Sequence, residues 1–385
     1  MNILLKNFSI GLIFYVISIG LSLLNAKFLV YSGGVELYAD FSYWITIINF
    51  SIPFISFGLP TFLLINSKKY FSNNLFGKIS VITIFFSIVP ASLYSLKFDF
   101  NFILYITIIA YCILNYYTVL SKKKENLIFH WFLKYFIKPG SIFIVLIFSV
   151  SKIENLYTYT SLIIFVILIL FYKPVIFNSF KKRNELGLIK AIKNSKSFYL
   201  NATIPVIFLY FDKIILIDKI SEIDYGTYQL LFKFSLFAGV PLLLLNSIFT
   251  KKIVEETNEK LKIHFRLFRI KSTLYSSIIA FGLILFSKYI FMFYEIQYIT
   301  ENILLFVLLL VVQVTSSAFG SVGIIASYKG LQKSVAIILF FTAIFHILLL
   351  LLIGNNLIKV VSVLIITTFI WNFLINRLVK NEILK

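Results

Sequence analysis

Apolar segments of 18 or more residues recur along almost the whole chain, and they constrain its fold more than any other feature. Each segment is long enough for a helix across a hydrocarbon core about 30 Å thick. The strands of a membrane barrel would instead alternate between apolar and polar residues over about ten positions. With 60% hydrophobic and only 14% charged residues, the composition suits a lipid environment. The sequence therefore predicts an all-α integral membrane protein.

We predict twelve transmembrane helices, at 8–30, 41–65, 79–96, 100–119, 128–150, 156–172, 198–219, 226–249, 272–293, 302–326, 334–353 and 357–376. Basic residues concentrate in alternate loops, at Lys68–Lys78, Lys122–Lys124, Lys173–Lys196, Lys251–Lys271 and Lys329–Lys333, and in the C-terminal tail. The intervening loops are mainly acidic. By the positive-inside rule, this asymmetry places both termini in the cytoplasm. The formal charge of +20 then reflects topology, and we expect no nucleic-acid partner.

The longest basic loop separates six predicted helices from six. We therefore predict an N-terminal six-helix bundle at 1–180, a cytoplasmic linker at 181–197 and a C-terminal six-helix bundle at 198–385. The linker is either a solvated loop or an amphipathic helix at the membrane surface.

A short internal repeat supports this division. Ala26–Val30 is followed by an acidic loop and then by Gly58-Leu59-Pro60, and Asp212–Leu216 is followed by an acidic loop and then by Gly239-Val240-Pro241. Because six helices separate the two occurrences, both halves have the same orientation. This predicts a parallel repeat about the membrane normal, with a binding site between the halves.

Three ionisable residues, Asp212, Lys213 and Lys233, interrupt apolar segments of the second half. A charge at mid-membrane costs at least about 2.5 kcal/mol, so such residues usually face a protein interior or a cavity. Adjacent helical residues point about 100° apart, so we expect Asp212 and Lys213 not to pair. Asp212 and Lys233 both lie about 12 Å from the loop that joins their helices, so a cross-helix ion pair is available. Such a pair either joins the two helices or tunes a lysine that faces a cavity.

Helix 128–150 carries His130, Lys134 and Lys138 at a spacing of four residues, which predicts one stripe on one face. The first two can extend back to the cytoplasmic surface, whereas Lys138 lies too deep to do so easily. Lys138 and Lys134 are therefore candidates for a cavity. Lys27 either extends to the outer surface or lines an outer vestibule.

His346 lies in the middle of helix 334–353. It is either a neutral side chain bonded to a neighbouring helix or a proton carrier. Together with Asp212, it is a candidate for ion coupling.

Lysines outnumber carboxylates within the predicted helices, so a cavity that they line would attract an anion. A diphosphate headgroup is a natural ligand, because lysine binds phosphate as a point charge. The sequence has no nucleotide-binding GxxxxGK[ST] loop, no HExxH or GxSxG motif, and Cys112 as its single cysteine. We therefore expect no cofactor, no metal and no disulfide, and a transporter rather than an enzyme.

The segment FDKIILIDKISEIDYGTYQLLFKFSLFAGVP resembles a signature of the polysaccharide-transporter family, which belongs to the MATE-like multidrug/oligosaccharidyl-lipid/polysaccharide exporter superfamily. The matching residues are Asp212, Lys213, Gly226, Tyr228, Lys233 and Pro241, and a later turn with Gly330, Gln332 and Lys333 is also similar. The resemblance covers the whole chain through its twelve helices and six-plus-six division.

The resemblance implies a flippase of the bacterial inner membrane. It would move an undecaprenyl-diphosphate-linked O-antigen or capsule repeat unit to the periplasmic leaflet, by alternating access coupled to an ion gradient. It further implies contact with membrane lipids, and with the polymerase and chain-length regulator of the same pathway. The alternatives are a lipid II flippase, a MATE-like drug antiporter, a membrane polymerase or glycosyltransferase, and a non-transporting scaffold for polysaccharide assembly.

Overall fold

The structure is a computed structural model that describes residues 2–60, 102–123, 127–148, 153–178, 195–255, 258–297, 299–320 and 322–382. Helices make up nearly all of these residues, and the described part of the chain contains no strand. Seven of the described helical stretches are long and apolar enough to cross a membrane. The prediction of an all-α chain is confirmed. The predicted helix 79–96 and most of the predicted linker 181–197 lie outside the described residues.

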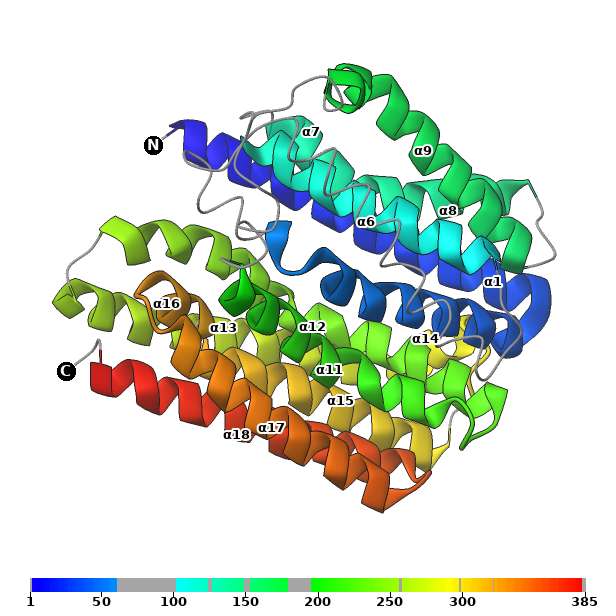
Figure 1. The fold of residues 1–385 in the computed structure, drawn as a ribbon. Helices are drawn as coiled ribbons and strands as arrows, with labels where there is room; N and C mark the ends of the chain where they lie inside the picture. The colour runs from blue at the N-terminus through cyan, green and yellow to red at the C-terminus, as the bar shows by residue number, and fades with distance from the viewer. Residues whose placement is uncertain are drawn as a thin grey trace. The chain divides into compact units, whose positions relative to one another are not determined.

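The chain forms two compact units, Met1–Thr203 and Ile204–Lys385, each of which has its own packing. The N-terminal unit contains α1 (Asn2–Ser56), α6 (Phe102–Lys123), α7 (Leu127–Trp131), the π-helix η1 (Phe132–Phe136), α8 (Ile137–Ile147) and α9 (Ile153–Asn178). Within it, α1 packs on α6 and α8, and α9 packs on α6 and α8 (Figure 1). Two predicted helices, 8–30 and 41–65, are joined in α1. Their boundary is a kink at Gly33 and Gly34, where Gly34 adopts a φ of 75° that favours glycine.

A π-helical turn interrupts the predicted helix 128–150. The N–H of Ile137 donates to the carbonyl of Phe132, five residues back, instead of four. Pro139 explains this turn, because it has no N–H and its ring clashes with the carbonyl four residues earlier. The π-helix adds one residue to the turn, so side chains spaced by four residues across it no longer lie on one face.

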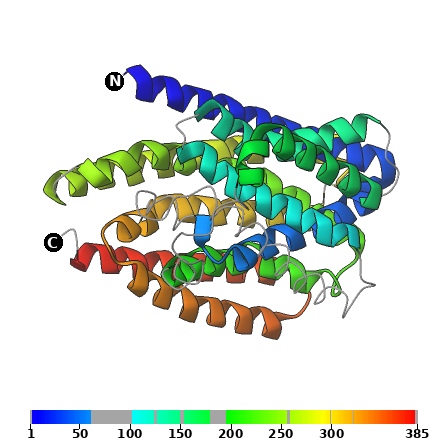
Figure 2. The same ribbon diagram turned by 45° about the horizontal axis from the view of Figure 1, so that its top comes forward.

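The C-terminal unit contains α11 (Lys196–Leu216, from Ile204 onward), α12 (Glu222–Glu255), α13 (Asn258–Leu285), α14 (Ser287–Phe293), α15 (Thr300–Phe319), α16 (Val322–Tyr328), α17 (Gln332–Ile353) and α18 (Leu357–Glu382). Helix α15 packs against α12, α13 and α18, and α17 packs against α18. In Figure 2, α15, α17 and α18 lie side by side in this unit.

Two helices of this unit differ from the predicted boundaries. Helix α12 begins after Ser221, whose hydroxyl accepts the N–H of Asp224 at 3.1 Å and caps the first turn. Helix α13 begins at Asn258, so most of the predicted basic loop Lys251–Lys271 is helical, and that prediction was wrong. The lysines and arginines there lie among Leu261, Phe265 and Phe268, which are buried in the core of the unit. A buried apolar face stabilises a helix even where its other face is strongly basic.

Candidate functional site

The C-terminal unit buries an ion pair where α11 meets α12. Asp212 and Lys213 are each 1% exposed. The Nζ of Lys213 lies 3.3 Å from Oδ2 of Asp212. The hydroxyl of Tyr228, on α12, donates a hydrogen bond to the same oxygen. The carboxylate is therefore satisfied by a cation and a phenol from within its own unit.

The prediction that the neighbours Asp212 and Lys213 do not pair was wrong. Their Cβ atoms do point in different directions, but the four-carbon stem of lysine is long enough to fold back along the helix. The Nζ of Lys213 consequently also donates to the carbonyl of Leu209, one turn earlier.

Aromatic rings surround the ammonium group of Lys213. Its Nζ lies 3.6 Å from the ring centroid of Phe232, 5.7 Å from that of Tyr228 and 5.8 Å from that of Tyr210. A cation over an aromatic face is attracted by the ring quadrupole, most strongly where water is excluded. We call Asp212, Lys213, Tyr228 and Phe232 the C-terminal centre. It is a closed group whose charges are matched internally.

The sequence suggested a cross-helix ion pair between Asp212 and Lys233. Among the described residues, Asp212 instead pairs with Lys213. Asp212 lies four residues before the end of α11, about 6 Å from it. Lys233 lies eleven residues after the start of α12, about 16 Å from it. Tyr228 lies about 9 Å from that start, closer to the level of the carboxylate. Lys233 therefore lies farther along α12 than Tyr228 does. It is half-buried and remains a candidate for the transport path.

His346 lies within the same unit, on α17, and is fully buried. Its Nδ1 lies 3.1 Å from Oγ1 of Thr367 on α18, and its ring centroid lies 5.1 Å from that of Phe208. The buried Nε2 has no hydrogen-bond partner among the described residues. His346 and Asp212 lie in the same unit, and their role in ion coupling stays a prediction.

The N-terminal unit contains a different polar group, which we call the N-terminal centre: Lys138, Tyr111 and Asn25. The Nζ of Lys138, on α8, lies 4.5 Å from the ring centroid of Tyr111 on α6. The Nδ2 of Asn25, on α1, donates to the carbonyl of Pro139 at 2.9 Å. The buried hydroxyl of Tyr111 and the buried Oδ1 of Asn25 have no hydrogen-bond partner among the described residues. This centre therefore has hydrogen-bonding capacity left over beside a cation.

The predicted stripe of His130, Lys134 and Lys138 is not present, because the π-helical turn lies between its members. His130 is buried, with Nδ1 2.8 Å from the carbonyl of Thr118. Lys134 is exposed, and its Nζ lies 4.8 Å from the ring centroid of Tyr135. Lys138 alone reaches the N-terminal centre.

Lys27, the remaining candidate, lies on α1 before the kink and is half-buried. Its role at an outer vestibule stays a prediction.

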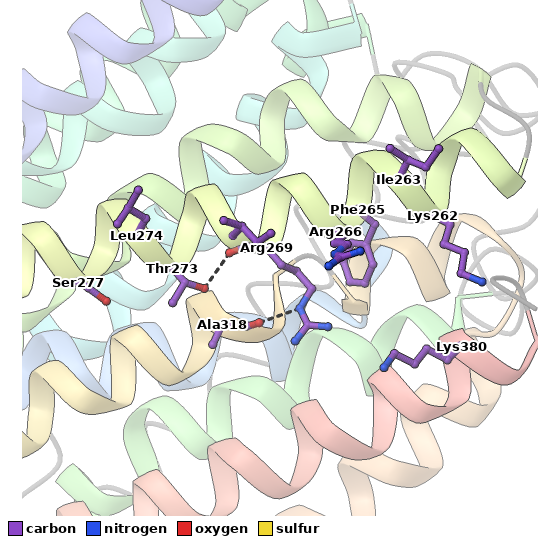
Figure 3. Close-up of a pocket in the computed structure, with 11 residues that line it drawn as sticks. Lys262, Ile263, Phe265, Arg266, Arg269, Thr273, Leu274, Ser277, Ala318 and Lys380 are labelled. Carbon is purple, nitrogen blue, oxygen red and sulfur yellow. Dashed lines mark hydrogen bonds between the residues drawn. The ribbon is translucent and has the colours of Figure 1, made fainter.

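The sequence analysis missed a basic pocket of about 1040 Å³ on the C-terminal unit. Its basic side chains come from α13 and α18 (Figure 3): Lys262, Arg266, Arg269 and Lys380. Residues 262, 266, 269 and 273 recur every three or four positions, the spacing of one face of a helix. This pattern is the sequence signal that could have predicted a helix in place of the loop.

Comparisons with known proteins identify the architecture. No protein-family model and no curated protein matches the chain. Solved structures do match it over nearly their whole lengths. A MATE transporter from Vibrio cholerae has a TM-score of 0.64 and 16% identity, with 99% of this chain and 97% of that chain covered. The chain has the fold of the MATE-like transporters.

Two further MATE-like structures have the same fold. A MOP superfamily transporter from Pyrococcus furiosus has a TM-score of 0.61, 12% identity and coverage of 99% and 95%. An outward-facing multidrug resistance MATE family transporter has a TM-score of 0.55, 14% identity and coverage of 98% and 95%. The MATE-like fold has twelve helices in two bundles, so the predicted fold class is confirmed. Identities this low establish the fold and leave the substrate open.

Proposed function

We propose that this chain is a flippase for a lipid-linked oligosaccharide with a diphosphate headgroup, such as the undecaprenyl-diphosphate-linked repeat unit of an O-antigen or a capsule. Alternating access of the two MATE-like bundles, driven by an ion gradient, carries the headgroup from the cytoplasmic to the periplasmic leaflet. The polyprenyl chain stays in the lipid. The protein works in the bacterial inner membrane, beside the polymerase and chain-length regulator that use its product.

The observation that carries this proposal is the sign of the buried charge. Asp212 is the one buried carboxylate among the described side chains, and Lys213 neutralises it. The other acidic residues with described side chains are all exposed: Glu36, Asp40, Glu154, Asp218, Glu222, Asp224, Glu259, Glu295 and Glu301. Lys138 and Lys233 add half-buried positive charge. An interior of this kind attracts an anion and repels an organic cation.

The N-terminal centre suits a phosphate oxygen in particular. Lys138 offers an ammonium group, and the hydroxyl of Tyr111 is a second donor that the described residues leave unused. A charge-assisted hydrogen bond from lysine to phosphate is stronger than a neutral one, and it remains reversible because lysine binds as a point charge.

The descriptions of the similar structures point to more than one function. The Pyrococcus furiosus transporter is described by a binding pocket of reverse polarity that suggests a different function. The outward-facing transporter is a multidrug resistance protein. The shared fold therefore supports a drug antiporter as a second candidate. The matched charges of the C-terminal centre argue against it, because a cationic drug needs a carboxylate that is free to bind it.

The test is translocation in proteoliposomes that contain a fluorescent polyprenyl-diphosphate oligosaccharide, read as protection of the label from an external quencher. Wild-type protein should accelerate protection, and Lys138→Gln should reduce the rate at least about tenfold, because it loses one charge-assisted bond. Lys134→Gln, an exposed lysine one turn away, is the matched control and should keep the wild-type rate. No acceleration by the wild type, together with proton-driven release of ethidium, would instead establish the antiporter.

A further inference from the structure

The basic pocket of the C-terminal unit is lined mainly by one face of α13, with Ala318 of α15 and Lys380 of α18 completing it. Figure 3 shows its residues in order along α13, from Lys262 to Ser277. That stretch is about 22 Å long, because a helix rises about 1.5 Å per residue. The pocket is therefore long enough for a headgroup and the first part of a lipid chain.

One end of the pocket is cationic. Lys262, Arg266 and Arg269 of α13 line this end together with Lys380 of α18 (Figure 3). No carboxylate is among the described residues that line the pocket. The pocket lies at the end of the unit that the positive-inside rule predicts to be cytoplasmic.

Arg269 is held in a fixed position. Its Nε donates to the carbonyl of Ala318 at 2.8 Å, and its guanidinium lies 5.8 Å from the ring centroid of Phe265. Arg269 lines the pocket, and a guanidinium held through Nε can donate to a ligand from its two terminal nitrogens. Gly320 makes this position possible, because it has a φ of 68° and a Cβ there would lie 2.8 Å from Cγ of Arg269.

The other end of the pocket is apolar. Ile270 and Leu274 line it and are each 55% exposed, next to the hydroxyls of Thr273 and Ser277. Both apolar side chains lie on α13, a helix that is long and apolar enough to cross a membrane. A soluble anion would gain nothing from these side chains, whereas a lipid chain would bury them.

From this arrangement we infer that the basic pocket is a loading site for a diphosphate-headed lipid. The diphosphate binds between Arg266, Arg269 and Lys380, and the first isoprene units lie along Ile270 and Leu274. The inference rests on the proposed function for its choice of lipid. It adds a binding site within the C-terminal unit, on α13, to the lysines that the proposed transport path uses.

The number of cations favours a diphosphate over an ordinary phospholipid. Four basic side chains line the pocket. A diphosphate diester carries about two negative charges and a phosphodiester only one, so the diphosphate leaves less positive charge unmatched. Two linked phosphates also offer more acceptor oxygens to guanidinium groups, which bind phosphate through parallel hydrogen bonds.

The test is native mass spectrometry of the detergent-purified full chain, titrated with a glycan-free polyprenyl diphosphate. Arg266→Gln should weaken binding about tenfold, the effect of losing one charge-assisted contact. Arg269→Lys keeps the charge but loses the paired N–H donors of the guanidinium group, so it should also weaken binding. Lys271→Gln and Arg377→Gln are matched controls, because they neutralise exposed basic residues on the same two helices outside the pocket.

Competition identifies the ligand. Phosphatidylglycerol and inorganic pyrophosphate should each compete at least about tenfold less well than the polyprenyl diphosphate. Equal competition by phosphatidylglycerol would overturn the diphosphate, and equal competition by pyrophosphate would overturn the lipid. Wild-type affinity of an Arg266→Gln protein that unfolds at the wild-type temperature would overturn the site.

The binding and translocation measurements can fail separately. If the wild type does not translocate the oligosaccharide but Arg266→Gln still weakens lipid binding, the proposed function fails and the pocket stands as a lipid site. If the wild type translocates and Arg266→Gln both binds and translocates normally, the loading site fails and the proposed function stands.

Discussion

Each unit buries a lysine against tyrosine, but the two surroundings are opposite in kind. In the C-terminal centre, Lys213 is matched by Asp212, and Tyr228 satisfies the carboxylate. In the N-terminal centre, Lys138 lies over Tyr111, whose hydroxyl has no hydrogen-bond partner among the described residues. The comparison teaches that a charge within a membrane protein is not by itself a binding site. The C-terminal centre holds its unit together, whereas the N-terminal centre has capacity to bind a ligand.

The largest expected effect comes from breaking the C-terminal ion pair. Asp212→Asn leaves the ammonium of Lys213 buried without its counter-charge, and such a change costs about 3–5 kcal/mol. We expect a loss of that size in the free energy of unfolding, measured by denaturant titration in detergent. The double variant Asp212→Asn with Lys213→Met should recover more than half of it, because neither charge then remains. If the losses in the free energy of unfolding of the two single variants simply add in the double variant, Asp212 and Lys213 do not interact.

The same kind of substitution should act in the opposite direction in the N-terminal centre. Lys138→Met removes a half-buried cation that faces no buried carboxylate among the described residues. It should therefore raise the free energy of unfolding, by about 2 kcal/mol, since replacing a buried charge by an apolar side chain is often stabilising. Translocation should fall at the same time. A destabilised Lys138→Met protein would mean that Lys138 is structural, like Lys213.

The two tyrosines give a smaller and cleaner comparison, because each loses only one oxygen. Tyr228→Phe removes the donor to Asp212 and should cost about 1.5–2 kcal/mol, the lower part of the range for a hydrogen bond to a charged group, because Lys213 still pairs with the carboxylate. Tyr111→Phe removes a buried hydroxyl that has no described partner, so it should be neutral or stabilising. Thermal unfolding of both variants in one detergent measures the difference. Equal losses would show that the hydroxyl of Tyr111 is already satisfied.

The apolar periodicity of the sequence was enough to predict the fold class and most of the helices. The side-chain pairing and the helix register instead depend on tertiary contacts and local distortions that the apolar pattern does not predict. The fold of Lys213 back onto Asp212 depends on side-chain reach and on the ring of Phe232, one helix away. The π-helical turn depends on Pro139, and the four-residue spacing of Lys134 and Lys138 did not reveal its effect on their register.

The basic pocket shows a different limit. Arg266 and Arg269 lie in a segment whose charge indicated a solvated loop, yet α13 begins at Asn258 because its other face is buried. Charge density alone therefore predicted the wrong secondary structure. The cytoplasmic side that it indicates for this segment stays a prediction.

The smallest expected effect separates a buried lysine from an exposed one on the same helical segment. Lys134 is exposed, and its Nζ lies over the rings of Trp131 and Tyr135 at 5.5 and 4.8 Å. A cation–π contact at an exposed site contributes about 0.5–1 kcal/mol, so Lys134→Met should lower the free energy of unfolding by no more than that. Because Lys134 lies outside the N-terminal centre, translocation should be unchanged. The two variants should then change stability in opposite directions, and only Lys138→Met should lose transport. Loss of transport in Lys134→Met would extend the anion path across the π-helical turn and remove the distinction between the two lysines.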